Sequence, residues 1–253
     1  GRMRAAVCRF ERALELNRDR SDGVLWEAST AAVFRAWALM YLGRVEEVAD
    51  GIEDLIAEAR SRGDLAAEAG FSSGLPNLAR SLRAPARAGV APAWSGTRIP
   101  STNVSQRYFD TVAQCHLDLL EGRPERAMAR IEGLWPTLGR SFVLHLQWLR
   151  IDAWFLRGVC ALAAGGLNTR GQLVAKAARR LRREDLPAGP ALADLLVHAA
   201  TGEANGARAD ALADRLEALD LGLFARALRG DAQLAALFVP RASGAAARSL
   251  SKD

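Results

Sequence analysis

The sequence predicts an all-α protein that folds as an α-solenoid of stacked helical hairpins, and three observations support this prediction. Apolar residues recur at spacings of three and four along most of the 253 residues, as in helices with a buried face. Glycines interrupt this pattern between successive segments, as they do just past helix C-termini. No segment shows the β-branched alternation of a strand. Because a helical hairpin cannot bury its apolar face alone, repeated hairpins are expected to stack.

Three amphipathic helices can be placed in order along the chain. The first covers residues 45–59, where acidic residues separate the apolar ones. The second covers residues 127–138 and follows Pro124, which suits the first turn of a helix. The third shows the same apolar spacing over residues 209–223. Joints between helices are predicted at Gly43, Gly122, Gly165 and Gly202.

The most hydrophobic helix is predicted over residues 141–164. It has one apolar face that includes Phe142 and Leu146 and another that includes Trp148, so it should be packed on two sides. Its remaining polar stripe consists of Gln147, Arg150, Trp154 and Arg157. This stripe is the candidate partner-binding groove, because such positions can line the concave side of a helical stack. The alternative is a solvated face on which arginine stems lie over Trp154.

The domain organisation is predicted as one helical-repeat domain over residues 1–240. It contains an irregular segment near 83–103 that is rich in proline, glycine and serine, with a short helix at 86–94 and an exposed loop. Residues 241–253 form a polar tail that is expected to be disordered. The first residue, Gly1, is not an initiator methionine, which suggests a piece of a longer protein.

Charge and composition argue against a nucleic-acid-binding surface and exclude a membrane span. The chain has 34 basic and 29 acidic residues, a formal net charge of +5, and all but two of the basic residues are arginines. These arginines are spread along the chain, with one short dense run over 179–183, so a nucleic-acid surface is not favoured. No apolar run is long enough to cross a membrane.

The cysteines and the N-terminus indicate the compartment. Cys8, Cys115 and Cys160 are far apart and stand in apolar helical contexts, so they are predicted to be buried, free thiols in a reducing cytoplasm. Arginines near the N-terminus interrupt any signal-peptide pattern.

Catalytic and metal-binding motifs are not found in the sequence. A protein kinase needs a glycine-rich loop, a strand lysine, an HRD catalytic loop and a DFG aspartate, and none is present; nor is a phosphate-binding P-loop. His116, His145 and His198 each stand alone, without a second ligand at zinc-binding spacing, and are predicted to be satisfied or half-buried helical residues. The sequence therefore predicts no catalytic residue, no cofactor and no metal.

Several motifs resemble a tetratricopeptide-like helical region found at the C-terminus of large bacterial serine/threonine protein kinases of the myxobacterial type. The resemblance covers the chain up to about residue 228 and rests on the segments 22–27 (DGVLWE), 34–39 (FRAWAL), 41–43 (YLG), 73–79 (SGLPNLA), 133–136 (GLWP) and 140–141 (RS). The chain departs from the pattern at 83–103, where an amphipathic helix is expected. No catalytic residue of the family can be transferred.

The resemblance implies a non-catalytic interaction or regulatory module whose parent would be the enzyme. Its partner would be a protein or peptide, favoured to be acidic by the arginines, or another domain of the parent chain. One alternative is the same module in an ATPase-linked transcriptional regulator or a cyclase. Another is a basic helical-repeat protein that binds RNA, which would bind polyanions with a steep salt dependence.

Overall fold

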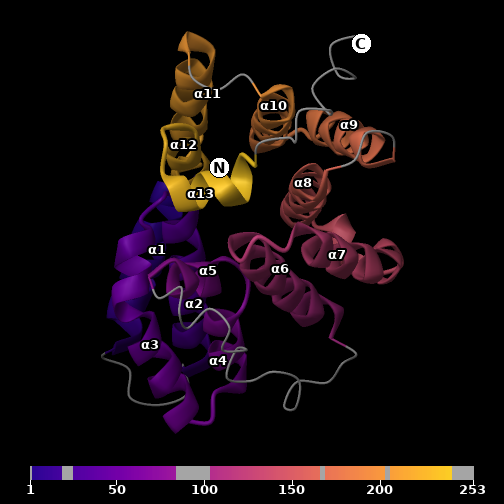
Figure 1. The fold of residues 1–253 in the computed structure, drawn as a ribbon. Coiled ribbons are helices and arrows are strands. Elements are labelled where there is room, and N and C mark those ends of the chain that lie inside the picture. Colours follow the sequence, from indigo (N-terminus) through magenta and orange to yellow (C-terminus); the bar gives the residue numbers. More distant parts are fainter. Residues whose placement is uncertain (1, 19–24, 84–102, 166–168, 203–205, 241–253) are drawn as a thin grey trace. The chain divides into compact units, whose positions relative to one another are not determined.

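The computed structural model describes residues 2–18, 25–83, 103–165, 169–202 and 206–240. In these residues the chain forms thirteen α-helices and one 3-10 helix, and no strand occurs among them, which confirms the all-α prediction (Figure 1). The segment 84–102 and the tail 241–253, with the predicted helix at 86–94, lie outside the described residues. The solenoid arrangement stays a prediction.

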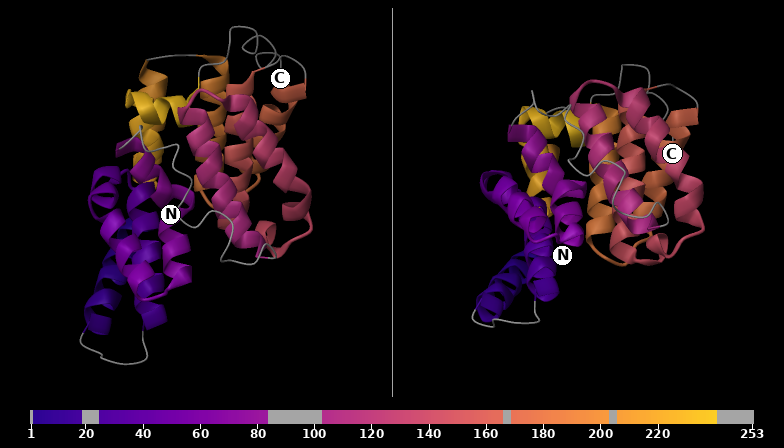
Figure 2. Two further views of the ribbon diagram at one scale, coloured as in Figure 1. Left: turned by 60° about the horizontal axis from the view of Figure 1, so that its bottom comes forward. Right: turned by 90° about the horizontal axis from the view of Figure 1, so that it is seen from below.

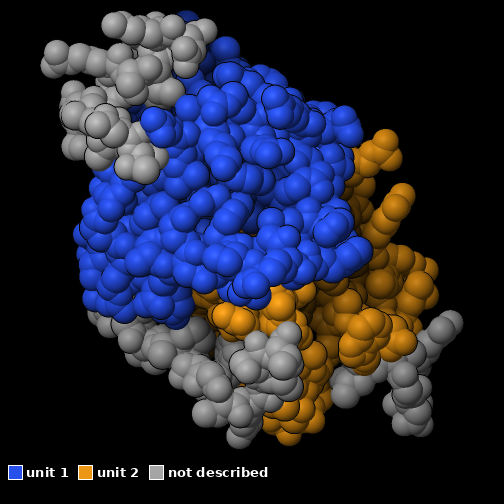
Figure 3. Space-filling model, turned by 90° about the vertical axis from the view of Figure 1, so that its right-hand side faces the viewer, with its two compact units in different colours: residues 1, 114–253 blue, residues 2–113 orange. Residues whose placement is uncertain are grey.

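The chain divides into two compact units, which Figure 3 colours separately. Unit 2 covers residues 2–113, and unit 1 covers residues 114–253 together with Gly1. The prediction of a single domain over 1–240 is not tested by this division. Each unit is described by itself below.

Unit 2 is built from five helices and the first part of a sixth. They are α1 (Met3–Arg18), α2 (Leu25–Tyr41), α3 (Val45–Ser61), α4 (Leu65–Ser72), α5 (Gly74–Arg83) and α6 (Val104–Leu120). The helix predicted at 45–59 is confirmed as α3, with Val45, Val48, Ile52 and Ala59 buried. Successive helices α1 and α2 lie side by side (Figure 2). Helix α3 contacts α2, α4 and α5.

Helices α2 and α5 approach each other closely in unit 2. Gly74, the first residue of α5, has a φ of +58°, and a Cβ atom there would lie 2.3 Å from Cζ2 of Trp37. Trp37 also meets Phe109 of α6 edge to face, with ring centroids 5.1 Å apart. Two of the sequence segments that carry the family resemblance, 34–39 and 73–79, are therefore in direct contact.

Unit 1 contains the rest of α6 and the remaining helices. They are α7 (Pro124–Gly139), the 3-10 helix η2 (Phe142–His145), α8 (Gln147–Ala164), α9 (Thr169–Arg182), α10 (Ala188–Thr201), α11 (Ala207–Ala218), α12 (Gly222–Leu228) and α13 (Ala232–Phe238). The helix predicted at 127–138 is confirmed as α7, with Pro124 in its first turn. Helix α8 contacts α7, α9 and α10, so the prediction that it is packed on more than one side is confirmed.

Two helix predictions in unit 1 are wrong at their ends. The helix predicted from Ser141 begins only at Gln147: the Ser141 side chain accepts a hydrogen bond from the Val143 N–H and caps η2, and Leu146 is extended at φ −75° and ψ 109°. As a result Phe142 and Leu146 are exposed rather than buried. The helix predicted over 209–223 stops at Ala218, because Asp220 adopts a φ of +61° before α12 begins.

The four predicted glycine joints are confirmed. Gly43, Gly122, Gly165 and Gly202 all have positive φ values between 67° and 77° and follow helices α2, α6, α8 and α10. Such values are strained for residues that carry a Cβ atom, so glycine ends each helix at low cost. Gly63 and Gly230 make further joints of this kind, after α3 and α12, that the sequence pattern did not single out.

Candidate functional site

The predicted groove residues are occupied by contacts within unit 1. The Arg150 Nε donates to Glu184 Oε1 at 2.7 Å, its Nη2 donates to Glu184 Oε2 at 2.7 Å, and the Gln147 side-chain amide donates to the same carboxylate at 3.2 Å. The hydrogen bonds from Arg150 lower the pKa of the Glu184 carboxyl below its ordinary value, although burial opposes the shift. This carboxylate thus joins the N-terminal end of α8 to the turn after α9.

Arg157 is the most enclosed member of the stripe. It is only 8% exposed, and its Nε and Nη2 donate to the two carboxylate oxygens of Glu132 at 2.5 and 3.0 Å. Its guanidinium carbon lies 3.9 Å from the ring centroid of Trp135 and 5.4 Å from that of Trp154. Such stacking is favourable when the cation is largely removed from water. The stripe therefore holds α7, α8 and the α9–α10 turn together. Arg157 lies over Trp154 as in the alternative interpretation, but it is buried and not part of a solvated face.

The two cysteine thiols of unit 1 are the side chains best suited to act as nucleophiles, but both are buried and neither has, among the described residues, a base beside it that would activate it. Cys115 and Cys160 are buried and free, as predicted, whereas Cys8 in unit 2 is exposed, so that part of the cysteine prediction is wrong. A hydrogen bond with Cys115 and burial raise the pKa of the Cys160 thiol well above its ordinary value. A thiol in this state is a poor nucleophile, because the thiolate is the reactive form.

Two of the three histidines differ from the prediction that each is satisfied or half-buried within a helix. His116 is buried beside Phe238, with ring centroids 5.7 Å apart, and its Nδ1 has no hydrogen-bond partner among the described residues. Burial lowers its pKa to about 4. His145 is exposed on the 3-10 helix and stacks on Phe142, and only His198 is half-buried in a helix. No group of three or more metal-ligating side chains gathers within the described ranges.

An apolar surface in unit 2 was not anticipated from the sequence. Helices α1 and α2 carry Phe10, Leu16, Trp26 and Phe34, here called the α1–α2 apolar surface. Trp26 is 68% exposed and Phe34 is 54% exposed. Phe34 stacks on Phe10, with ring centroids 6.2 Å apart. Single exposed apolar residues are ordinary, but here Leu16, Trp26 and Phe34 are all exposed on one pair of helices, which makes this pair a candidate contact surface.

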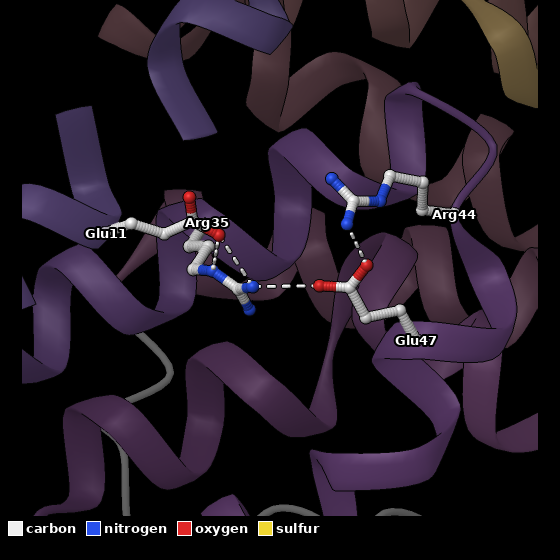
Figure 4. A network of polar contacts seen from close by, with 4 residues as sticks. All are labelled: Glu11, Arg35, Arg44 and Glu47. Atoms are coloured by element: carbon white, nitrogen blue, oxygen red, sulfur yellow. Dashed lines mark hydrogen bonds and ion pairs between the residues drawn. The ribbon is translucent and has the colours of Figure 1, made fainter. Parts of the chain in front are cut away.

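A network of ion pairs fixes the two helices of this surface (Figure 4). The Arg35 Nη2 on α2 donates to Glu11 of α1 at 2.9 Å and to Glu47 of α3 at 2.8 Å. Glu47 also pairs with Arg44 at 2.5 Å. Glu11 and Arg35 directly follow Phe10 and Phe34 in the sequence, so the network connects α1 and α2 close to the stacked rings. Surface ion pairs contribute little individually, but a network of this kind restricts how the helices can move relative to each other.

Comparison with protein-family models, with curated proteins and with solved structures found no match for this chain. No helix in the described part of the chain combines the length and the apolar character needed to cross a membrane.

Proposed function

We propose that the chain is a non-catalytic protein–protein interaction module, a tetratricopeptide-like α-solenoid that forms the C-terminal part of a bacterial serine/threonine protein kinase. The single observation that most supports binding is the exposure of Trp26 and Phe34 on the α1–α2 apolar surface. Aromatic side chains dominate the energetics of protein interfaces when a partner covers them. Both rings stand on α2, which the ion pairs of Arg35 connect to α1 and α3.

The helical-repeat part of the proposal is supported by the local structure. Consecutive helices pack on one another, as α1 does on α2 and α8 on α9, and glycines with positive φ separate several of them. These are the properties of helical hairpins that stack through apolar faces. The kinase part rests on the sequence segments that resemble the family, two of which meet at Trp37 and Gly74. ATP binding and phosphoryl transfer would belong to residues outside this chain.

The partner in this proposal is the polypeptide encoded directly upstream of Gly1 in the same reading frame. Replacing Trp26 and Phe34 together with serine is expected to weaken its binding to this chain by at least about tenfold, because buried aromatic anchors each contribute about 1–2 kcal/mol or more. Isothermal titration calorimetry with the separately expressed upstream polypeptide measures this directly. Far-UV circular dichroism checks that the variant remains folded.

The matched control is the double change Phe142→Ser and Leu146→Ser on unit 1. These two side chains are 71% and 44% exposed, so the control also removes two exposed apolar side chains but leaves α1 and α2 intact. Unchanged binding in the control together with weakened binding in the Trp26 and Phe34 variant supports the proposal. Equal binding by all three proteins would show that the α1–α2 apolar surface does not contact this partner.

A further inference from the structure

The outward face of α9 carries four cations in a single stripe. Lys176, Arg179, Arg180 and Arg183 are all exposed and follow the spacing i, i+3, i+4 and i+7, which places them on one side of a helix. Arg183 lies just past the last residue of α9, but its N–H donates to the Arg180 carbonyl at 3.2 Å. The helical turn therefore continues through Arg183. These four residues are called the α9 basic stripe.

The members of the α9 basic stripe have no hydrogen bond or ion pair through their side chains to any other residue that the structure describes. This distinguishes them from the two other arginines of the same helix. Arg170 donates to Glu125 at 2.7 Å, and Arg182 pairs with Asp194 at 3.3 Å. Unit 1 thus neutralises the cations on the flanks of α9 and leaves those on its outward face unpaired.

Packing fixes which face of α9 points outward. The opposite side of the helix is buried in unit 1, where α9 contacts α8 and α10 (Figure 1). The residues that it buries are Val174, Ala177, Ala178 and Leu181. Because this face is held by the core, the α9 basic stripe is presented to solvent as a rigid row about 10 Å long, from the rise of 1.5 Å per residue.

The electrostatic repulsion within the α9 basic stripe is unfavourable in the free protein. Like charges at i, i+3 and i, i+4 repel each other on a helix surface, and the four residues form four such pairs. Cations near a helix C-terminus are favoured by the helix dipole, which accounts for Arg179, Arg180 and Arg183. It does not account for Lys176, which precedes the last turn, nor for the alignment of all four on one face.

We propose that the α9 basic stripe is the docking surface for an acidic helical segment of a protein partner. Carboxylates at the same i, i+3, i+4 and i+7 spacing would meet all four cations and remove their mutual repulsion. A single-stranded nucleic acid is the less suitable occupant, because α9 has no aromatic residue on which a base can stack. The inference rests on the proposed function only in that the chain binds protein, and it specifies the chemistry of one partner.

The test uses two fluorescein-labelled peptides of about 20 residues, long enough to populate a helix. In the first, glutamates occupy one helix face at the spacing of the stripe; in the second, the same glutamates are distributed around the helix. We expect the first peptide to bind the wild-type chain more tightly than the second, and added salt to weaken its binding. The variant Lys176→Gln, Arg179→Gln, Arg180→Gln, Arg183→Gln should bind it at least about tenfold more weakly. Fluorescence anisotropy gives the affinities.

The matched control removes four exposed arginines outside α9, with Arg2→Gln, Arg9→Gln, Arg107→Gln and Arg140→Gln, so both variants lose the same net charge. Unchanged affinity in this control supports the inference. Equal losses in both variants would overturn it, because net charge alone would explain them. Tighter binding of an oligouridylate of equal charge, lost in the stripe variant, would overturn it in favour of RNA. If neither peptide binds while the upstream polypeptide does, this inference fails and the proposed function stands.

Discussion

Replacing Gly74 with alanine is expected to destabilise unit 2 by about 3 kcal/mol. Part of this cost arises because an L-residue in the left-handed region loses about 1–2 kcal/mol. The rest arises because the added Cβ would lie 2.3 and 2.4 Å from two ring atoms of Trp37, and overpacking of this kind costs about 1–3 kcal/mol. Trp37 cannot simply move away, because it also packs against Phe109. Urea unfolding followed by tryptophan fluorescence measures the change.

The control for this variant is Gly51→Ala in the same unit. Gly51 lies inside α3 and has nothing within 4 Å of an added Cβ. Alanine there is expected to stabilise the protein by about 0.5–1 kcal/mol, because glycine is a poor residue for a helix interior. Opposite signs for the two substitutions assign the cost to the positive φ and the Trp37 contact at Gly74, and not to an alanine side chain as such. A Gly74→Ala protein within about 0.5 kcal/mol of wild type would contradict the described packing of α2 against α5.

The second large effect is a loss of stability in acid that depends on His116. Burial lowers its pKa from 6.5 to about 4 in the folded chain, so between these values the unfolded chain binds more protons than the folded one. The contribution of His116 is therefore fully present above pH 6.5 and is lost as the pH falls toward 4. Its size over this range is about 3 kcal/mol, at 1.36 kcal/mol per pKa unit.

The variant His116→Leu isolates this contribution. Leucine cannot be protonated, and it removes the Nδ1 atom that has no partner in the described structure. The difference in unfolding free energy between wild type and variant should change by about 3 kcal/mol between pH 7.5 and pH 4. Other titrating groups cancel in this difference. Among them is Asp110 in unit 2, whose pKa is raised to about 6 by burial and which contributes with the opposite sign. Parallel stability curves would show that His116 is not buried as described.

Much of the fold could be predicted from the sequence, because it depends on local signals. The spacing of Val45, Val48 and Ile52 defines a helix by itself, and the glycines at 43, 122, 165 and 202 mark helix ends because the left-handed conformation favours glycine. The errors occur where a side-chain cap or a backbone torsion ends the helix although the apolar pattern continues. Neither the Ser141 cap nor the positive φ of Asp220 changes the spacing of the apolar residues around it.

The candidate sites were less predictable because they depend on contacts between distant residues. Gln147, Arg150, Trp154 and Arg157 all lie on α8, but their role as a partner-binding groove stays a prediction. No sequence signal, however, pairs Arg150 with Glu184, which is 34 positions away. The exposure of Trp26 and Phe34 is likewise set by which helices cover α2, and periodicity cannot distinguish a covered aromatic residue from an uncovered one. The α9 basic stripe was visible as a dense run over 179–183, but its lack of partners was not.

The measurement that tests the account most directly is the DNA sequence upstream of Gly1 in the source gene. The account predicts an open reading frame that continues into a protein kinase catalytic domain, with its HRD and DFG motifs, and so makes this chain the interaction module of that kinase. An in-frame stop codon upstream of Gly1 with no HRD or DFG motif between the two would contradict the kinase assignment and would make the chain a protein without a kinase domain.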